Sequence, residues 1–293
     1  MSRMASTGAL LGARQSWQAL RHFADDPLAC MGALQEAHGD RVGLRLGCRR
    51  VLFVFHPTDA AQVLRRDAES FGRSRLVFDK IIPLTGRRGL VQLDGDEGNQ
   101  ARQRTGVVVS GPAIAAVYPE LAANAQAALA ALDDAARTGS PLDLSHWITC
   151  LVMQNACSVL LGDAGVDAQP LAEAFLAVHR LCGPSLRRFV PRVNLRHRLA
   201  LYHTTRRLRE RARAWLTAPQ APASRTGLVG VLAAQPWPPS DACDHLLTYL
   251  FAGYETTAAS LIWTFYLLAR HPQVHAAAAE EGAGIWHGCG PSH

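Results

Sequence analysis

Gly253, Glu255 and Thr256 lie together near the middle of the longest apolar run in the sequence, residues 240–271. A carboxyl group beside a hydroxyl group can hold water and relay protons into an apolar cavity. Gly253 has no Cβ, so a flat group can approach the backbone closely there. The Thr256 hydroxyl follows the Ala252 carbonyl by one helical turn, and a hydrogen bond between them would compete with the helix ladder and open it locally. These residue types predict proton transfer beside a flat ligand.

The element that must position these residues is a long helix. Residues 246–269 are hydrophobic on nearly every side of a helix, and Glu255 is their only formal charge. A glycine inside a helix costs about 1 kcal/mol relative to alanine, and a buried carboxylate costs more unless it is paired or protonated. Such a local weakness in a strong element indicates function. Two other interpretations are a transmembrane span, in which Glu255 would cost about 2.5–3.5 kcal/mol, and an ordinary buried helix with a packing glycine.

The motif A-G-Y-E-T-T, followed by the run Y-L-L-A-R-H-P, resembles the oxygen-binding central helix of the cytochrome P-450 family. The family pattern is Ala or Gly, then Gly-x, then Asp or Glu, then Thr-Thr. The resemblance implies that Ala252 and Gly253 lie against a haem. It also implies that Thr256 and Glu255 act in catalysis by helping to deliver protons to dioxygen.

A second stretch with the same resemblance begins at Asp94 and is expected to form a helix through Arg104. Its first turn is acidic, which complements the helix dipole. The family usually shows D-G-x-x-W-x-x-x-R here, so the resemblance implies that Arg102 contacts a haem propionate, which a guanidinium can bind bidentately. Gly98 stands where the family has Trp or His, which removes one propionate donor. The alternative for Arg102 is a solvated helix residue.

Pattern and composition predict a mainly α fold with a small β-sheet near the N-terminus, an incomplete cytochrome P-450 fold. The chain has 293 residues, of which 48% are hydrophobic and 18% charged, enough for one large core. We expect a single domain over residues 1–275 and an irregular Gly-rich tail over 276–293. Within the domain we expect strands at 41–46 and 50–55, a loop-like segment at 71–90, and helices at 27–38, 61–66, 94–104, 115–136 and 144–161. Thr58 is the predicted cap of the 61–66 helix, and Asp143 or Ser145 that of the 144–161 helix.

The net charge is +6, and residues 187–213 are dense in arginine around an apolar stripe. A basic amphipathic helix can bind nucleic acid or a membrane surface. The segment carries no helix-turn-helix, zinc-finger or RNA-binding signature, which favours a long solvated helix over a core. We therefore expect neither a nucleic-acid nor a membrane partner.

The seven cysteines form no C-x-x-C pair and are odd in number, which is typical of reduced thiols in a cytosolic protein. The N-terminus lacks a continuous apolar segment before its first acids, so we expect no secretory signal and no anchor helix. Both features predict a cytoplasmic location.

The resemblance also implies features that the sequence lacks after His271. The family has an E-x-x-R helix there and a Gly-rich loop, F-x-x-G-x-R-x-C-x-G, whose Cys thiolate ligates the haem iron. Cys289, in G-C-G-P, lacks the preceding Phe and Arg. We therefore expect a truncated or frame-shifted chain that offers no residue as a metal ligand and is inactive alone.

Three functions remain open from the sequence. The first is a haem-dependent monooxygenase that inserts oxygen into a small apolar substrate, with electrons from a partner of the ferredoxin and ferredoxin reductase type. The second is a haem-free remnant or binding protein with the same helices. The third is a basic regulatory module that binds nucleic acid.

Overall fold

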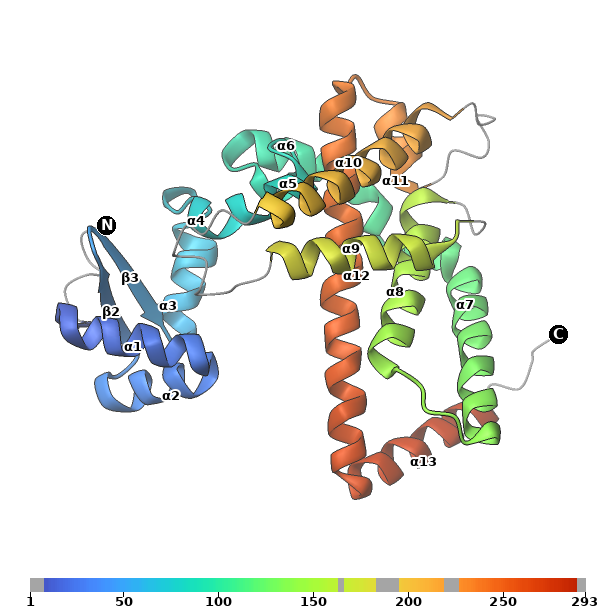
Figure 1. The fold of residues 1–293 in the computed structure, drawn as a ribbon, viewed down its shortest axis with the longest axis horizontal. Coiled ribbons are helices and arrows are strands. Elements are labelled where there is room, and N and C mark those ends of the chain that lie inside the picture. The colour runs from blue at the N-terminus through green and yellow to red at the C-terminus, as the bar shows by residue number, and fades with distance from the viewer. Residues whose placement is uncertain (1–7, 163–165, 183–194, 219–226, 289–293) are drawn as a thin grey trace. The chain divides into compact units, whose positions relative to one another are not determined.

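The computed structural model describes residues 8–162, 166–182, 195–218 and 227–288. Its contacts divide the chain into two compact units, one ending at Ser74 and the other beginning at Arg75. The described residues are mainly helical, with one small sheet near the N-terminus (Figure 1). The fold class predicted from the sequence is therefore confirmed.

The first unit contains a three-stranded sheet in the order β1-β2-β3. Its elements are β1 Ala9–Leu10, α1 Ala13–Asp25, α2 Pro27–His38, β2 Arg41–Leu46, β3 Arg49–Val54, α3 Pro57–Ala61, the π-helical turn η2 Gln62–Arg66 and the 3-10 turn η3 Ala68–Ser70. β2 pairs parallel with β1 and antiparallel with β3, and the hairpin turns through Gly47 at φ 61°. A small core of Leu11, Cys30, Leu34, Val42 and Leu44 lies between the sheet and the helices.

Both predicted strands of the first unit are found, at 41–46 as predicted and at 49–54, one residue earlier than predicted. α2 has the predicted bounds, because Asp26 accepts a 2.9 Å hydrogen bond from the Ala29 amide and Gly39 ends the helix at φ 81°. The predicted helix at 61–66 is wrong: α3 starts at Pro57 and is followed by a π-helical turn. The predicted Thr58 cap is wrong too, because the His56 ring accepts from the Thr58 amide instead.

The second unit consists of helices and short helical turns. These are α4 Arg75–Phe78, η4 Asp79–Ile81, α5 Ile82–Thr85, η5 Leu90–Gln92, α6 Gly95–Thr105, η6 Gly106–Val109, α7 Gly111–Thr138, α8 Leu144–Leu161, α9 Ala168–Cys182, α10 Leu195–Thr217, α11 Gly227–Ala233, α12 Pro239–Arg270 and α13 Pro272–Gly288. α8 has the predicted bounds, and its predicted cap is Asp143, which accepts a 3.0 Å hydrogen bond from the His146 amide. The arginine-rich segment is helical from Leu195 onward, and its earlier part lies outside the described residues.

Two segments of the second unit are more helical than their composition indicated. The stretch expected to be loop-like, 71–90, contains α4, η4 and α5 and ends where η5 begins. The tail expected to be irregular continues as α13 to Gly288, because its four consecutive alanines and two glutamates favour helix more strongly than its scattered glycines oppose it.

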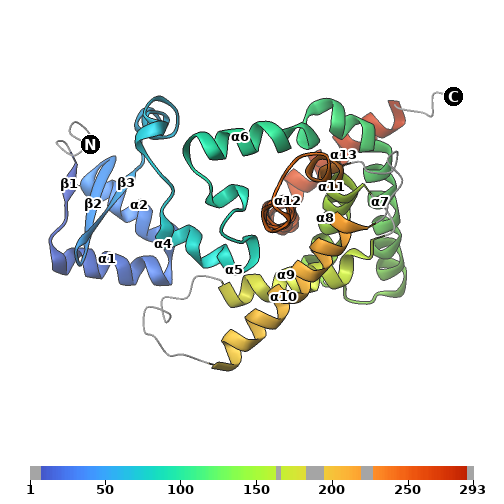
Figure 2. The same ribbon diagram turned by 90° about the horizontal axis from the view of Figure 1, so that it is seen from above.

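α12 is the element around which the second unit is built (Figures 1 and 2). Its N-terminal half is packed against α8, α9 and α10 in one large core that includes Met153, Phe175, Leu246, Leu250 and Tyr254. Beyond Ala258 the helix is largely exposed: Trp263 is 62% and Tyr266 47% accessible. The apolar helix predicted from the sequence is thus a core element over only its first half.

Among the described residues, α8 is the one helix that by itself is long and apolar enough to cross a membrane, and half of it is buried in the protein. The core helix of a protein without membrane spans meets the same criterion. α12, considered as a span from its sequence, does not meet it.

Candidate functional site

The exposed face of α12 carries the residues that the sequence singled out. Ala252, Gly253, Thr256 and Thr257 are all exposed, whereas Tyr254 between them is buried. Because an α-helix has 3.6 residues per turn, positions four apart share a face. The four exposed residues therefore form one surface of small side chains. We call Ala252, Gly253, Thr256 and Thr257 the small-residue face. Glu255 is half-buried at its edge.

The Thr256 hydroxyl donates a 3.0 Å hydrogen bond to the Ala252 carbonyl, as the sequence predicted. The predicted opening of the helix is wrong, because α12 is one continuous α-helix from Pro239 to Arg270. A carbonyl oxygen has two lone pairs, so it can accept from the hydroxyl without giving up the backbone bond. Thr264 makes the same kind of bond to the Ser260 carbonyl at 2.8 Å. The bond at Thr256 therefore fixes the hydroxyl without breaking the helix.

An apolar groove of about 430 Å³ lies beside the small-residue face, between α7, α8 and α12. Its lining residues are Val109, Leu121, Leu151, Val152, Asn155, Ala156, Val159, Leu160, Tyr249, Ala252, Gly253, Thr257 and Leu261. Among the described residues, only Ala156 comes within 4 Å of the position that a Cβ on Gly253 would take, at 3.9 Å. The packing of the described residues therefore does not require glycine at this position. A flat ligand that approaches the backbone closely would be a reason for it.

Arg102 lies half-buried on α6 and donates to the Asn99 side chain at 3.3 Å. A Cβ on Gly98 would lie 2.6 Å from the Leu93 carbonyl oxygen and 3.2 Å from an Arg102 guanidinium nitrogen. The departure from the family pattern at Gly98 thus has a local cause, since backbone and guanidinium fill the space that a side chain would need. The pattern alone did not reveal this constraint.

α6 is tied to α12 next to the small-residue face. The buried Thr105 hydroxyl lies 2.8 Å from the Tyr249 hydroxyl and also donates to the Ala101 carbonyl at 2.7 Å. Thr105 follows Arg102 by three residues, and Tyr249 precedes Gly253 by four. The structure therefore brings the helix of Arg102 to the stretch of α12 just before the small-residue face. Nothing in the local sequence indicated that Thr105 and Tyr249 would meet.

The described residues carry three features that would suit one side of a haem. The small-residue face offers a flat surface, the groove offers apolar walls, and Arg102 offers a cation on the neighbouring helix. None of the cysteines whose surroundings are described lines the groove, and burial raises the pKa of the Cys157 and Cys243 thiols. Within the described parts of the chain there is also no cluster of three or more metal-ligating side chains. A thiolate ligand would therefore have to come from other residues.

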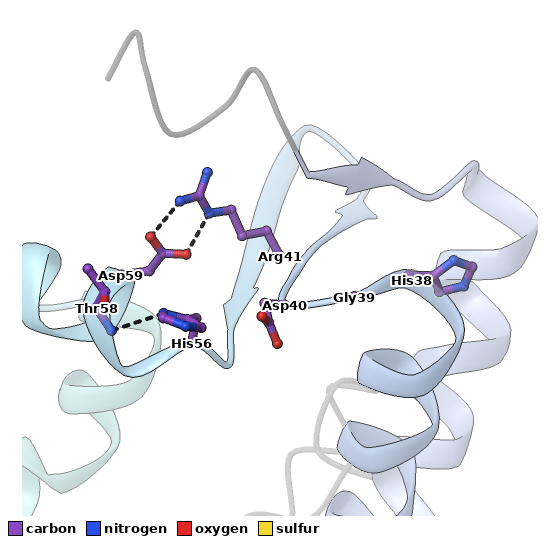
Figure 3. Close-up of a pocket in the computed structure, with 7 residues that line it drawn as sticks. All are labelled: His38, Gly39, Asp40, Arg41, His56, Thr58 and Asp59. Atoms are coloured by element: carbon purple, nitrogen blue, oxygen red, sulfur yellow. Dashed lines mark hydrogen bonds and ion pairs between the residues drawn. The ribbon is translucent and has the colours of Figure 1, made fainter.

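The first unit contains a second, different pocket of about 520 Å³ (Figure 3). It is lined by His38, Gly39, Asp40, Arg41, His56, Thr58 and Asp59. The Arg41 guanidinium donates to both carboxylate oxygens of Asp59, at 2.6 and 2.5 Å, and this pairing lowers the pKa of Asp59. Arg41 and Asp59 are thus paired with each other, and this open, polar pocket does not resemble an apolar cofactor site.

The fold and the site describe a helical protein with an apolar groove beside its central helix. The profile of the cytochrome P-450 family matches residues 14–221 and 241–288. The chain belongs to the cytochrome P-450 family.

Two bacterial relatives illustrate the extent of the match. The chain is 28% identical over 262 residues to cyclooctat-9-en-7-ol 5-monooxygenase of Streptomyces melanosporofaciens, covering 85% of this chain and 55% of the relative. It is 26% identical over 289 residues to pentalenene oxygenase of Streptomyces avermitilis, covering 94% and 61%. The chain therefore spans less than two thirds of the length of either relative.

Solved structures show the same fold. A cytochrome P-450, CYP102L1, superimposes with a TM-score of 0.70 at 17% identity, over 90% of this chain and 63% of that one. The retinoic acid-bound cyanobacterial CYP120A1 gives 0.70 at 18% identity, over 89% and 59%.

Proposed function

We propose that this chain is the part of a haem-dependent monooxygenase that contains the oxygen-binding central helix. The whole enzyme would insert oxygen into a small apolar substrate. The observation that carries the proposal is the small-residue face of α12, with the Thr256 hydroxyl held at 3.0 Å from the Ala252 carbonyl beside an apolar groove. Membership of the family supports it. So do the two bacterial relatives, whose names describe a monooxygenase and an oxygenase.

Each residue of the site has a distinct role in this proposal. Ala252 and Gly253 form the flat surface against which a haem would rest, and Arg102 would bind a propionate through its guanidinium. Bound haem would supply the activation of dioxygen and the transfer of one oxygen atom to the substrate. Thr256 holds a proton at its hydroxyl oxygen, within reach of water, and Glu255 exchanges protons with that water. The apolar groove walls would shield a ligand that rests on Ala252 and Gly253 from bulk water.

These 293 residues alone are not expected to turn over, because their sequence offers no haem-loop cysteine to supply a thiolate. With that ligand supplied, electrons would come from a ferredoxin and ferredoxin reductase pair. The cysteine pattern of the sequence supports a cytoplasmic location. The identity of the substrate is proposed only as a small apolar molecule.

The test uses a chimera in which the C-terminal part of pentalenene oxygenase, beyond the matched region, is joined to this chain. Thr256→Ala is compared with Thr264→Ala, whose hydroxyl makes the same bond to a carbonyl four residues earlier on an exposed part of α12. With a panel of cyclic hydrocarbons, Thr256→Ala should lower the product formed per dioxygen consumed at least fivefold. Thr264→Ala should leave this ratio unchanged. Equal ratios in the two variants would remove Thr256 from proton delivery.

The haem-free alternative is separated by the spectrum of the reduced, carbon monoxide-bound chimera. A thiolate-type Soret band supports the monooxygenase, and its absence supports a haem-free binding protein. The nucleic-acid alternative is weakened by α10 itself: Arg209 pairs with Asp244 at 2.7 Å and Arg206 with Glu210 at 2.8 Å. Arginines that are engaged within the protein are less available to phosphates.

A further inference from the structure

Asp244, on the N-terminal half of α12, is a buried carboxylate that joins three segments of the second unit. Its Oδ1 accepts a 2.7 Å hydrogen bond from the Arg209 guanidinium of α10. Its Oδ2 accepts a 3.1 Å hydrogen bond from the backbone N–H of Arg88, in the segment between α5 and η5. The Asp244 side chain is only 8% exposed. A buried carboxylate with a partner on each oxygen is costly to disrupt, because removing one partner leaves the charge uncompensated.

The backbone of residues 86–89 is pressed against α12 at the same place. A Cβ on Gly86 would fall 1.9–2.0 Å from the carboxyl atoms of Asp244, and Gly86 has φ 72°. A Cβ on Gly89 would fall 2.2 Å from the hydroxyl oxygen of Thr248, one turn further along α12. Two glycines three residues apart thus fit against two α12 side chains four residues apart. Only a segment without side chains at both positions can approach this closely.

Arg88 extends the connection from α12 to α6. Its guanidinium donates to Asp241 of α12 at 3.2 Å and also pairs with Glu97, in the first turn of α6. The other end of α6 is held by the hydroxyl pair of Thr105 and Tyr249 at 2.8 Å. α6 is therefore linked to α12 at both ends, through Arg88 at its first turn and through Thr105 at its last residue. Arg102 lies between these two contacts in the sequence.

We propose that Asp244 is a positioning residue that anchors the 86–89 segment on α12 and, through Arg88, sets the place of α6 and of Arg102 beside the small-residue face. Asp244 itself does not line the groove beside the small-residue face. The inference rests on the proposed function only for the role of Arg102 toward a propionate, because the connection from α12 to α6 stands on the structure alone.

The first arm of the test measures amide hydrogen exchange in the 293-residue chain without ligand. Asp244→Asn keeps the shape of the side chain and removes its charge, and should speed exchange at residues 86–89 and in the first turn of α6 at least tenfold. Arg88→Ala keeps the backbone N–H that Asp244 accepts from, so it should speed exchange in α6 alone. Asp134→Asn, which breaks an exposed pair with Arg137, is the control and should change neither segment.

The second arm measures the affinity of the same chain for ferric haem and for its dimethyl ester, which lacks the propionate charges. Arg102→Gln should abolish the preference for haem. Asp244→Asn and Arg88→Ala should each reduce that preference at least threefold while leaving the affinity for the ester nearly unchanged. A purely structural role would weaken both ligands alike.

Three outcomes decide the matter. Unchanged exchange in α6 of Asp244→Asn overturns the positioning role. Faster exchange with an intact preference for haem also overturns it, since Arg102 would then not depend on Asp244. If even the unmodified chain shows no preference, the role of Arg102 in the proposed function fails, and the exchange arm alone supports or overturns the anchoring of α6.

Discussion

Replacing Gly89 by alanine tests whether the 86–89 segment packs as closely on α12 as the structure shows. The new Cβ would lie 2.2 Å from the Thr248 hydroxyl oxygen, 2.4 Å from the Thr85 carbonyl oxygen and 3.1 Å from the Asp244 carbonyl oxygen. The last two are backbone atoms, which no change of rotamer can move. Gly89 has φ −62° and ψ 148°, which alanine adopts freely, so the cost is one of contact alone.

The magnitude follows from two opposing effects. Forcing a methyl group into a filled site costs about 1–3 kcal/mol. Replacing glycine where its φ and ψ suit alanine returns about 0.4–1 kcal/mol by restricting the unfolded chain. We therefore expect Gly89→Ala to lower the free energy of unfolding by up to about 2.6 kcal/mol, with a midpoint of about 1.3 kcal/mol. For a unit of this size the midpoint corresponds to a fall in Tm of about 3–5 °C.

Gly106→Ala is the matched control for this substitution. Gly106 has φ −66° and ψ −17°, and nothing lies within 4 Å of its would-be Cβ. The same change of residue should therefore raise the free energy of unfolding by about 0.4–1 kcal/mol. Urea unfolding followed by far-UV circular dichroism measures both variants. If Gly89→Ala proves as stable as Gly106→Ala, the close approach of the segment to α12 is wrong.

Two further predictions concern buried titratable groups. Burial lowers the pKa of His245 below its ordinary 6.5, and its Nδ1 has no hydrogen-bond partner among the described residues. Because the unfolded chain then binds the proton more readily, the free energy of unfolding should fall as the pH drops below about 6.5. His245→Leu should flatten that pH dependence, as measured by urea unfolding between pH 7.5 and 5. The same pH dependence in the variant and the unmodified chain would contradict the prediction. Burial raises the pKa of the Cys157 thiol to about 12, whereas Cys48 is exposed. Iodoacetamide at pH 8 should therefore label Cys48 in the native chain and Cys157 only after denaturation, as peptide mass spectrometry would show; equal labelling in the native chain would mean that Cys157 is accessible.

The parts of the fold that could be predicted from the sequence are those set by local patterns. The bounds of α2 and α8 follow from an acidic cap at one end and a glycine at the other, both readable within a few residues. The Thr256 bond to Ala252 could be predicted because it spans a single helical turn. That α12 stays continuous at this bond could not be predicted, because it depends on whether the Ala252 carbonyl also keeps its hydrogen bond from a backbone N–H.

The anchoring of α6 could not be predicted from the sequence, because its connections link residues far apart in the chain. Arg88 and Asp244 are separated by 156 positions, and Thr105 and Tyr249 by 144. In the sequence Asp244 is one of two acids in the first two turns of a helix, which is common near a helix N-terminus and suggests only an interaction with the dipole. Its role emerges from what packs on it: two glycines that admit the backbone of another segment, and an arginine from α10 that balances its charge.

The same reasoning separates two kinds of glycine in this chain. Gly86, Gly89 and Gly98 are required by neighbouring atoms of the chain itself, because a Cβ at each would collide with atoms less than 3 Å away. Gly253 is not, since its would-be Cβ meets only an ordinary contact at 3.9 Å. Glycine weakens a helix by about 1 kcal/mol relative to alanine, and the packing of the described residues does not call for it at Gly253. In the proposed function a flat ligand would account for Gly253, while close packing of the 86–89 segment on α12 accounts for Gly86 and Gly89.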